Sequence, residues 1–530
     1  MRANLFKYIF FICAIIIIIG AIYFIYFRED ETSKNEQTNT IQTEQEKTNS
    51  QLHLGISNFD TINPLLTNNK EVLNIDTIIF EPLIQIDENY KTSLCLAKEC
   101  SKISPTSYVI KVDNNKKWSD NTTVTSKDVQ FTIDRLKEGK SVYSYNVEKI
   151  ASVEIIDAET IKINLSQEVP FFEYNLTFPI LPNNYYLGED FNTSTKTPIG
   201  TGMYKISSIE SSQIILEKNE NWWNKKSKDA KINQIVIKLY SEVGEIYNSF
   251  KLGNVDMFTT STTNIENYIG TIGYGKKEWK GRNFDYLAMN CQETVLQDVN
   301  VRKAIAMCIN KENIVSSVFN NQSYVSQFPL DFGSYVYNQE NTGIAFQQEE
   351  AKKLLTDNGW TYKNNRWQKR INGSNKRLEF TITVQQSNTQ RVAVAENIKS
   401  QLEQVGIKVT VKQVTDSQYQ TILNNKSYQM ILTGVYNSYS PNVETFLGSN
   451  NLQNYENAEI LQLLNEVKEI TDENTLKEKY KRIVEIYNEE IPFISLYRNK
   501  QTAVKGQELA GELIGNNYSS FYNIANWTRM

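Results

Sequence analysis

The sequence predicts a mixed α/β fold that is divided into more than one domain. A chain of 530 residues is too long for a single hydrophobic core, and that length is typical of two to four domains. From Leu52 onward, strand-like and helix-like stretches alternate without an internal repeat, which indicates mixed α/β domains. A composition of 40% hydrophobic and 22% charged residues is ordinary for a globular protein with a large core.

The first 27 residues predict a membrane anchor. Residues 8–27 are twenty residues without a charge, preceded by Arg2 and Lys7. A helix of that length spans roughly 30 Å, the thickness of a bilayer core. No small residues mark a cleavage site, and Cys13 follows a large residue where a lipoprotein signal needs a small one. We expect an uncleaved single-pass helix at about 8–27 in the cell membrane, with the rest of the chain extracellular; a buried core helix is the alternative.

Residues 28–50 predict a flexible linker behind the anchor. The segment has one large apolar residue and no aromatic residue, so it cannot bury enough surface to offset the entropy of ordering. As a coil it reaches roughly 25 to 30 Å. A globular body on such a tether would work close to the outer face of the membrane.

Composition also excludes several classes of function. The net charge is −5, from 56 basic and 61 acidic residues without a basic block, which argues against nucleic acid as a partner. His53 is the only histidine, which argues against histidine-based metal sites and histidine-dependent catalytic triads. There is no glycine-rich phosphate loop, no Gly-x-Ser-x-Gly motif and no cysteine pair at zinc spacing. We therefore expect no catalytic residues, no metal and no cofactor.

A strand, a turn and a capped helix follow one another near residue 120. Trp118 opens a turn-forming cluster that ends at Asn121, and a helical spacing of apolar residues follows up to residue 136. Thr125 and Asp128 have the spacing of a capping box at the start of this helix.

Further helices and strands are predicted by periodicity. Helices are expected at 348–357, 392–405 and 458–488, and Gly359 and Gly406 suit the position after a helix. Strands are expected at 213–216, 235–239, 378–384, 408–414 and 430–432. The helix–strand succession from 392 to 434 is typical of an open α/β sheet, in which ligands bind beyond the carboxyl ends of strands.

Short stretches along the chain match, in the same order, the motifs of one known family. The turn and helix at 117–136 look like its Lys-Trp-Ser-Asp-Gly-Thr signature, with Asn121 in place of the glycine; asparagine also tolerates a left-handed turn. The other stretches are GISNFDTINPLL (55–66), IIFEPLIQID (78–87), TPIGTGMYKI (197–206), KNENWW (218–223), KLGNVDMF (251–258), YLAMN (286–290), LQDVNVRKAIAMCINKENI (296–314), EEAKKLLTDNGW (349–360) and EEIPFISLY (489–497). Together they resemble the extracellular solute-binding proteins of family 5, the dipeptide- and oligopeptide-binding receptors of ABC importers, over about residues 51–530.

This resemblance implies a two-lobed α/β fold of the periplasmic-binding-protein-like type II class, with a small extra domain inserted in lobe I. Two chain crossings, near 284–290 and 492–497, would form a hinge that closes on ligand. In the family the Trp-Ser-Asp turn belongs to the inserted domain, so Trp118 is expected to pack rather than to contact ligand. The implied domains are lobe I at 51–77, 190–283 and 496–530, the inserted domain at 78–189, and lobe II at 284–495.

The function implied by the resemblance is transport without covalent chemistry. A monomeric, membrane-anchored receptor would capture a peptide or similar small solute and deliver it to the permease subunits of an ABC importer. A peptide or pheromone sensor without a permease is the main alternative. A metal-chelate binder is disfavoured by the lack of histidines, and a peptidase by the lack of a catalytic constellation.

The resemblance also implies a ligand site with contributions from both lobes. Affinity for many peptides would come from pairing the ligand main chain with the segment 430–439 as an added strand. Asn68 and Lys70 match family positions at the cleft entrance, and Tyr286 matches a ligand-facing tyrosine at the hinge; a plain surface role is the alternative for each. From the pairing segment, the expected ligand residues are Gly434, Val435, Tyr436, Asn437, Ser438 and Tyr439.

One family feature is missing from this chain. Peptide-binding members place an aspartate after this strand to pair with the ligand's ammonium group, but here the position falls on Ser438 or Tyr439, and Glu444 is the first acid downstream. An unpaired buried ammonium costs several kcal/mol. We therefore expect a ligand that is amino-blocked, bound in another register, or not a simple peptide.

The cysteines leave one covalent question open. Cys95 and Cys100 lie in the part expected outside the cell, where disulfides survive, and Cys100 replaces a tryptophan common in the family. A Cys95–Cys100 disulfide and two free thiols are both compatible with the sequence. Cys291 and Cys308 are expected to be buried thiols.

Overall fold

The computed structural model of the protein describes residues 50–262 and 264–530. The predicted anchor at 8–27, Cys13, and the linker apart from its last residue lie outside the described residues. Within the two described ranges, no helix is long and apolar enough to cross a membrane.

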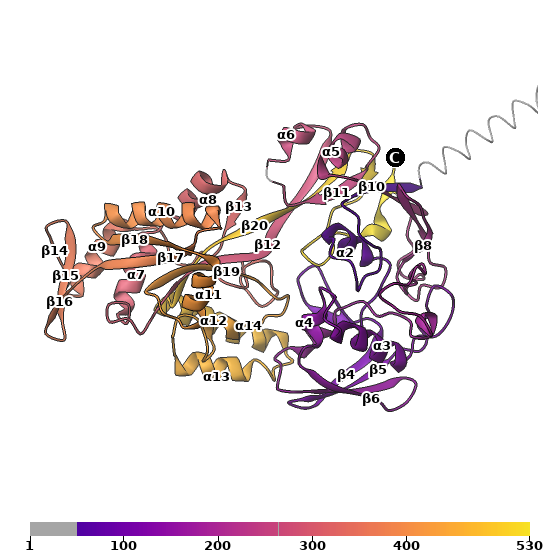
Figure 1. Cartoon of the computed structure of the whole chain (residues 1–530), viewed down its shortest axis with the longest axis horizontal. Helices are drawn as coiled ribbons and strands as arrows, with labels where there is room; N and C mark the ends of the chain where they lie inside the picture. Colours follow the sequence, from indigo (N-terminus) through magenta and orange to yellow (C-terminus); the bar gives the residue numbers. More distant parts are fainter. Residues whose placement is uncertain (1–49, 263) are drawn as a thin grey trace, which may run out of the picture.

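The fold consists of two lobes joined by two long central strands (Figure 1). One eleven-stranded sheet runs through both lobes. Its strands are, in spatial order, β18 (Lys408–Val414), β17 (Glu379–Gln385), β19 (Met430–Tyr436), β12 (Tyr274–Met289), β20 (Phe493–Gly506), β11 (Met257–Thr260), β1 (Gln51–Ser57), β10 (Gln234–Tyr240), β9 (Gln213–Lys218) and β8 (Tyr204–Ile209), with β13 (Ser323–Val325) also paired to β20.

The two lobes meet where the pairing of β12 with β20 is interrupted. Up to Lys280, β12 pairs with residues 500–506 of β20, and β20 also pairs with β11 of the first lobe. From Phe284 onward, β12 pairs with residues 493–498 of β20 and with β19 of the second lobe. The register shift at 281–283 marks the crossing, slightly before the predicted first crossing and beyond the predicted second one. Both strands keep a strand-like pattern through the break, so periodicity did not reveal it.

The first lobe carries a second, smaller sheet. It has the order β4 (Ala97–Ser104), β5 (Ser107–Val112), β7 (Thr160–Leu165) and β6 (Ile150–Ile155), and its residues fall within the segment expected to be inserted. Its apolar residues belong to the same core cluster as those of β1 and β10. The other elements of this lobe are α2 (Lys70–Asp76), β2 (Ile84–Ile86), β3 (Thr92–Leu94), α3 (Ser126–Lys137), α4 (Ser144–Val147), α5 (Val243–Lys251), α6 (Glu266–Ile269), β21 (Leu509–Ala510) and β22 (Thr528–Arg529).

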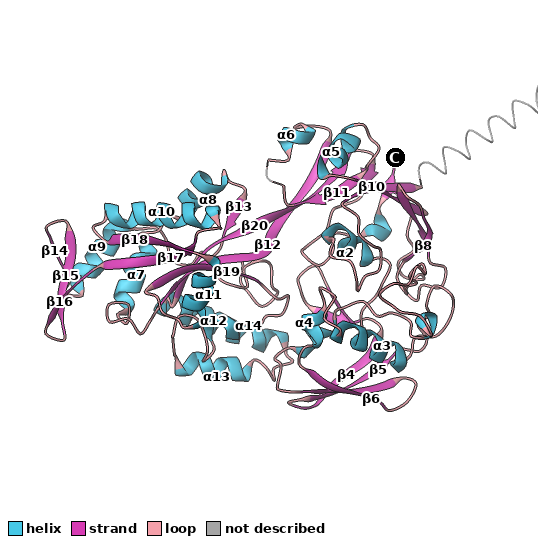
Figure 2. Cartoon of the chain, in the orientation of Figure 1, coloured by secondary structure: helices cyan, strands magenta, loops and turns pink. Residues whose placement is uncertain are grey.

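The second lobe has helices on both faces of its part of the sheet (Figure 2). Strand alternation explains the two layers, because Leu287 and Met289 of β12 join one core cluster while Tyr286 and Ala288 join the other. The elements of this lobe outside the large sheet are α7 (Val299–Met307), α8 (Lys311–Phe319), α9 (Gln348–Asp357), α10 (Thr389–Gln404), α11 (Asp416–Asn424), α12 (Glu444–Leu447), α13 (Ala458–Glu466), α14 (Glu473–Glu490), β14 (Thr361–Lys363), β15 (Arg366–Ile371) and β16 (Ser374–Arg377).

The turn and helix near residue 120 are confirmed. Trp118 is 1% exposed and packs in the first lobe's core, and Asn121 has the left-handed φ of 71° that its turn position requires. The Asp128 carboxylate accepts hydrogen bonds from the backbone N–H and the hydroxyl of Thr125, at 2.7 and 3.0 Å. This unit is therefore scaffold.

One local prediction was wrong. The helix expected at 458–488 is two helices, α13 and α14, because Asp472 caps a new start by accepting from the Thr475 N–H. Of the two alternatives that the sequence left open for Cys95 and Cys100, the structure has the free thiols. Cys95 precedes β4 and is buried, whereas Cys100 lies within the strand and is only partly buried.

Candidate functional site

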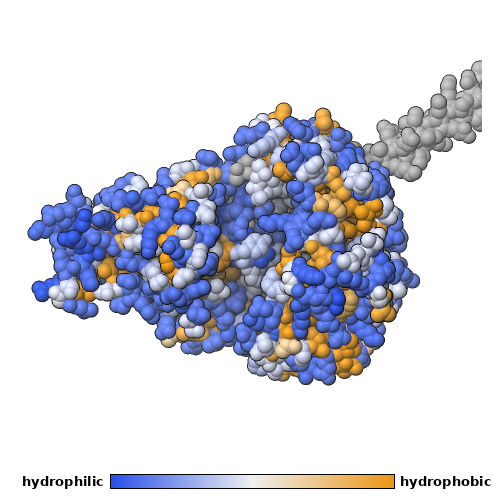
Figure 3. All heavy atoms as spheres, in the orientation of Figure 1, coloured by the Kyte–Doolittle hydropathy of each residue, from blue (hydrophilic) through white to orange (hydrophobic). Residues whose placement is uncertain are grey.

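A cavity of about 470 Å³ lies where the two lobes and the central strands meet. The surface is hollowed between the lobes in Figure 3. Volumes of this order hold drug-sized or short-peptide ligands. The lining residues come from around α2 (Asn68, Lys70, Leu73, Asn74, Asp76, Thr77, Phe80, Pro82), from the inserted segment (Val142, Tyr143, Tyr145, Thr177, Pro179), from the central strands and β11 (Thr259, Trp279, Arg282, Asn283, Asn499, Gln501), from the segment after β19 (Tyr436, Tyr439) and from the C-terminal region (Asn516, Asn517, Tyr518).

Helix α2 forms one wall of the cavity. The Asn69 side chain caps the helix by accepting from the N–H groups of Glu71 and Val72, and its amide donates to the Ser57 carbonyl at the end of β1. This cap fixes the helix on the sheet. Lys70, at the start of this wall, is exposed, and Asp76, at its end, is buried.

Asp76 is a buried acid that no group in the described part of the chain pairs with. Its side chain is 1% exposed, and neither carboxylate oxygen has a hydrogen-bond partner among the described residues. Burial raises the pKa of Asp76 well above its usual value, and the nearby carboxylate of Asp60 raises it further. Within this site, Asp76 is therefore an acceptor that no protein group satisfies.

Arg282 is a buried cation in another wall of the same cavity. Its Nε donates to the Asn437 carbonyl at 2.5 Å, and its guanidinium lies 4.2 Å from the ring centre of Tyr436 and 3.8 Å from that of Tyr439. Across the described residues, no carboxylate forms an ion pair with Arg282. Besides exposed Lys70, the cavity therefore presents a buried arginine without a carboxylate partner and a buried acid without a hydrogen-bond donor, both judged among the described residues.

Aromatic and amide groups complete the lining. The indole N–H of Trp279 is buried and has no acceptor within the described chain. The Tyr439 hydroxyl donates to the Asn517 carbonyl at 2.8 Å, which ties the segment after β19 to the C-terminal region. The Tyr439 ring also packs edge-on against Tyr518. The cavity thus has a mixed aromatic and polar wall with a free donor.

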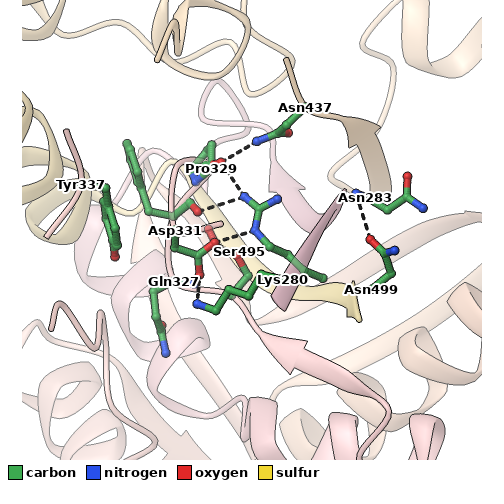
Figure 4. A network of polar contacts seen from close by, with 12 residues as sticks. Lys280, Asn283, Gln327, Pro329, Asp331, Tyr337, Asn437, Ser495 and Asn499 are labelled. Carbon is green, nitrogen blue, oxygen red and sulfur yellow. Dashed lines mark hydrogen bonds and ion pairs between the residues drawn. The ribbon is translucent and has the colours of Figure 1, made fainter. Parts of the chain in front are cut away.

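A network of buried charges supports the crossing strands beside the cavity (Figure 4). Asp331 accepts from Arg498 Nε at 2.5 Å and from Lys280 Nζ at 3.0 Å, and so connects β20 to β12. Burial raises the pKa of Asp331, but the two cations outweigh this and hold it below its usual value. Asn499 Oδ1 accepts from the Asn283 N–H at 3.1 Å across the register break.

The structure brings some of the predicted site residues into the cavity. Asn68, Lys70, Tyr436 and Tyr439 line it. Tyr286 does not; it is 0% exposed and packs against Phe284, Phe446 and Phe493 with its hydroxyl unpartnered among described groups. Gly434, Val435, Asn437 and Ser438 are also outside the lining.

The segment around Gly434 is occupied by protein groups. Arg391 Nε donates to Asp285 Oδ1 at 2.5 Å, and a Cβ on Gly434 would lie 2.2 Å from Arg391 Nη2. Gly434 therefore makes room for this ion pair. The backbone N–H and carbonyl of Asn437 are used by the carbonyl and side chain of Arg282. Glu444 pairs with Lys468 at 2.9 Å and does not line the cavity.

Sequence reasoning missed Asp76, Trp279 and Arg282. A signal for Asp76 existed, because Val72, Ile75 and Asp76 have the i, i+3, i+4 spacing of one buried helix face. A carboxylate on such a face is unusual enough to mark a site. Trp279 and Arg282 carried no comparable signal, since strand alternation does not show which side faces a cavity.

Comparison with known proteins identifies the family. The family model "Bacterial extracellular solute-binding proteins, family 5 Middle" matches residues 93–457, which is more than half of the chain. The chain belongs to this family. Its members are substrate-binding proteins and not enzymes.

Relatives and solved structures agree with this membership. The chain is 22% identical over 489 residues to the oligopeptide-binding protein AppA of Bacillus subtilis strain 168, covering 88% of this chain and 89% of AppA. It is 23% identical over 387 residues to a putative ABC transporter peptide-binding protein of Brucella ovis, covering 68% and 69%.

Two solved structures show the same fold. The unliganded open form of the periplasmic murein tripeptide-binding protein MppA superposes with a TM-score of 0.76 at 18% identity, covering 91% of this chain and 97% of MppA. A nickel ABC transporter protein of Bacillus halodurans gives 0.75 at 18%, covering 90% and 100%. In the described part of this chain, no group of three or more His, Cys, Asp and Glu side chains could hold a metal ion.

Proposed function

We propose that this family 5 protein captures a peptide or similar small solute and delivers it to the permease of an ABC importer. The observation that carries the proposal is the 470 Å³ cavity, because both lobes and both crossing strands line it. A ligand held there bridges the lobes and favours their closure. The printed names of AppA and of the Brucella relative support a peptide as the ligand class.

Part of the ligand main chain would pair with β19. Strand β17 pairs with β19 only at Met430 and Ile431, whereas β12 pairs along the whole of β19. From Thr433 to Tyr436, one edge of β19 is thus without a strand partner. We retain Gly434 and Val435 as proposed neighbours of the ligand through this edge, and Asn437 and Ser438 as proposed neighbours just beyond it. Asn68, Lys70, Tyr436 and Tyr439 are the proposed side-chain contacts.

The test of the function is identification of the bound solute. Full-length protein is purified under mild conditions and examined by native mass spectrometry, followed by sequencing of released material. We expect peptides, and we expect deletion of the gene to abolish uptake of those peptides by cells. Retention of a non-peptide solute alone, with normal peptide uptake in the deletion strain, would contradict the proposal.

We also propose that the chain is held at the membrane by residues 8–27. The uncharged run and the large residue before Cys13 support a helix over a lipid modification. Replacing Cys13 with Ser should therefore leave the protein in the membrane fraction, whereas replacing two central isoleucines of the run with Asp should release it. Release by Cys13→Ser alone would establish lipidation instead.

A further inference from the structure

We propose that Asp76 binds the ammonium group of the ligand and that Arg282 binds its carboxylate, so that the cavity selects short peptides with both termini free. This inference rests on the proposed function and deepens it. It assigns the cation to helix α2 of the first lobe, not to the segment after β19, where Ser438 and Tyr439 carry no charge.

The first argument is that Asp76 is buried with nothing to pair with. Both its oxygens are enclosed and unpartnered within the described chain, although the residue lines a cavity large enough for a ligand. A buried carboxyl group without a partner is unfavourable in either protonation state. An arriving ammonium would supply the missing donors.

The surroundings of Asp76 make the site selective for a cation. Asp76 ends α2, where the helix dipole is negative and repels a carboxylate. The titratable groups that face it are Asp60 and the phenol of Tyr143, and neither supplies positive charge. The positive charge that would stabilise ionised Asp76 therefore has to come from the ligand.

Asp331 is another buried aspartate of this protein, but it has several hydrogen-bond partners. Asp331, which is also 1% exposed, accepts from Arg498, Lys280, the Ser326 hydroxyl and the Gln327 N–H. Among the described residues, Asp76 has no partner of any of these kinds. This contrast between two equally buried aspartates marks Asp76 as a group whose partner is supplied from outside.

The second argument is the orientation and charge of Arg282. The Asn437 carbonyl and the rings of Tyr436 and Tyr439 fix the guanidinium in place, yet no described carboxylate neutralises it. An arginine held in this way is prepared to bind a planar carboxylate with two parallel hydrogen bonds. Because Arg282 lies at the register break between the lobes, its ligand would contact the hinge directly.

The two charges and the volume together describe one ligand. A cavity of about 470 Å³ with a cation site in one wall and an anion site in another fits a short zwitterion. A peptide with a blocked amino terminus would leave Asp76 unpaired, and a peptide amide would leave Arg282 unpaired. Each loss weakens binding because a buried polar group of the protein stays without its partner.

The test compares one pool of tripeptides in three forms, with free termini, N-acetylated and C-amidated, by competition in native mass spectrometry on the full-length protein. We expect the wild type to prefer free over acetylated peptides by about tenfold or more. In Asp76→Asn this preference should fall below about twofold, while the preference for free over amidated peptides remains. Arg282→Lys should show the converse pattern.

A matched control and a second readout separate this role from a structural one. Glu444→Gln, which removes an acid outside the cavity, should leave both preferences unchanged. Calorimetry in two buffers of different ionisation enthalpy should show proton release when wild type binds free peptide, and none for Asp76→Asn. The wild-type comparison does not depend on the folding of any variant.

Each contrary outcome has a defined meaning. Equal binding of free and acetylated peptides by the wild type, or an unchanged preference in Asp76→Asn, overturns the inference and leaves the proposed function standing. Failure of all three pools to bind, with a non-peptide solute copurifying, overturns the proposed function and the inference with it.

Discussion

Asp76 lowers the free energy of unfolding, because burial disfavours the charged form of its carboxyl group. Burial raises its pKa, so the folded state binds a proton that the unfolded state releases near pH 4. The resulting penalty grows as pH rises above that value. Asp76→Asn should therefore raise the free energy of unfolding at pH 7, and the gain should shrink as pH falls toward 4. Denaturant titrations at the two pH values measure this difference.

The opposite result would have a clear cause. If Asp76→Asn lowered stability at pH 7, the carboxylate would be satisfied by a partner within the protein. Asp331→Asn serves as the comparison, because Asp331 has partners and its loss should destabilise. A gain in stability with a loss of ligand preference is the behaviour typical of a binding residue.

The family resemblance implied that Tyr286 faces the ligand, but the structure places this residue in the core. Its ring is stacked on Phe284 in the core and its hydroxyl is buried without a described partner. Tyr286→Phe should therefore stabilise the protein by about 1 kcal/mol and change peptide affinity less than about twofold. Thermal unfolding and calorimetric titration measure these effects. A tenfold loss of affinity would restore Tyr286 as a ligand contact.

At the scale of elements, the network between the crossing strands carries much of the hinge's stability. Asp331→Asn leaves Arg498, which is 0% exposed, without its carboxylate, and should cost about 3–5 kcal/mol. Ser326→Ala removes only a neutral partner of Asp331 and should cost about 1 kcal/mol. Urea denaturation of both variants gives the comparison; equal small losses would show that the network is solvated.

The same network predicts a dependence on pH. The pKa of Asp331 is held below its usual value in the folded state, so its contribution is fully present above about pH 4. This contribution is lost as pH falls below that value and Asp331 takes up a proton. Asp331→Asn should accordingly flatten the acid limb of the stability profile.

Elements were predictable where one period governed a whole segment. The helix at 348–357 and the strand at 408–414 have the predicted bounds, since a single amphipathic or alternating pattern runs through each. The break at 467–472 was missed because apolar spacing continues across it, although the Asp472 cap was visible in the sequence. Which residues line the cavity depends on how segments far apart in the sequence come together. The apolar pattern of a single segment does not contain this information.

The whole molecule should respond to one ligand on both sides of the hinge. Segments 70–76 and 436–439 belong to different lobes, and each contributes residues to the lining of the same cavity. Peptide should therefore slow amide hydrogen exchange in both segments together, and also at the register break 281–283. Mass spectrometry of exchanged protein measures this. Protection confined to one lobe would show that the ligand does not bridge the cavity.

The position of β20 in the sheet has a consequence for the timing of synthesis. This strand pairs with β12 and β11 at the centre of the sheet, and residues 516–518 beyond it close the cavity. A ribosome makes α2 more than four hundred residues before these segments, so the earlier strands wait with an open gap between them. Such long-range pairing folds slowly and exposes unpaired edges meanwhile. A nascent chain that ends before β20 therefore cannot capture solute, and it depends on chaperones until β20 has been made. A chain that terminates before β20 never completes the sheet.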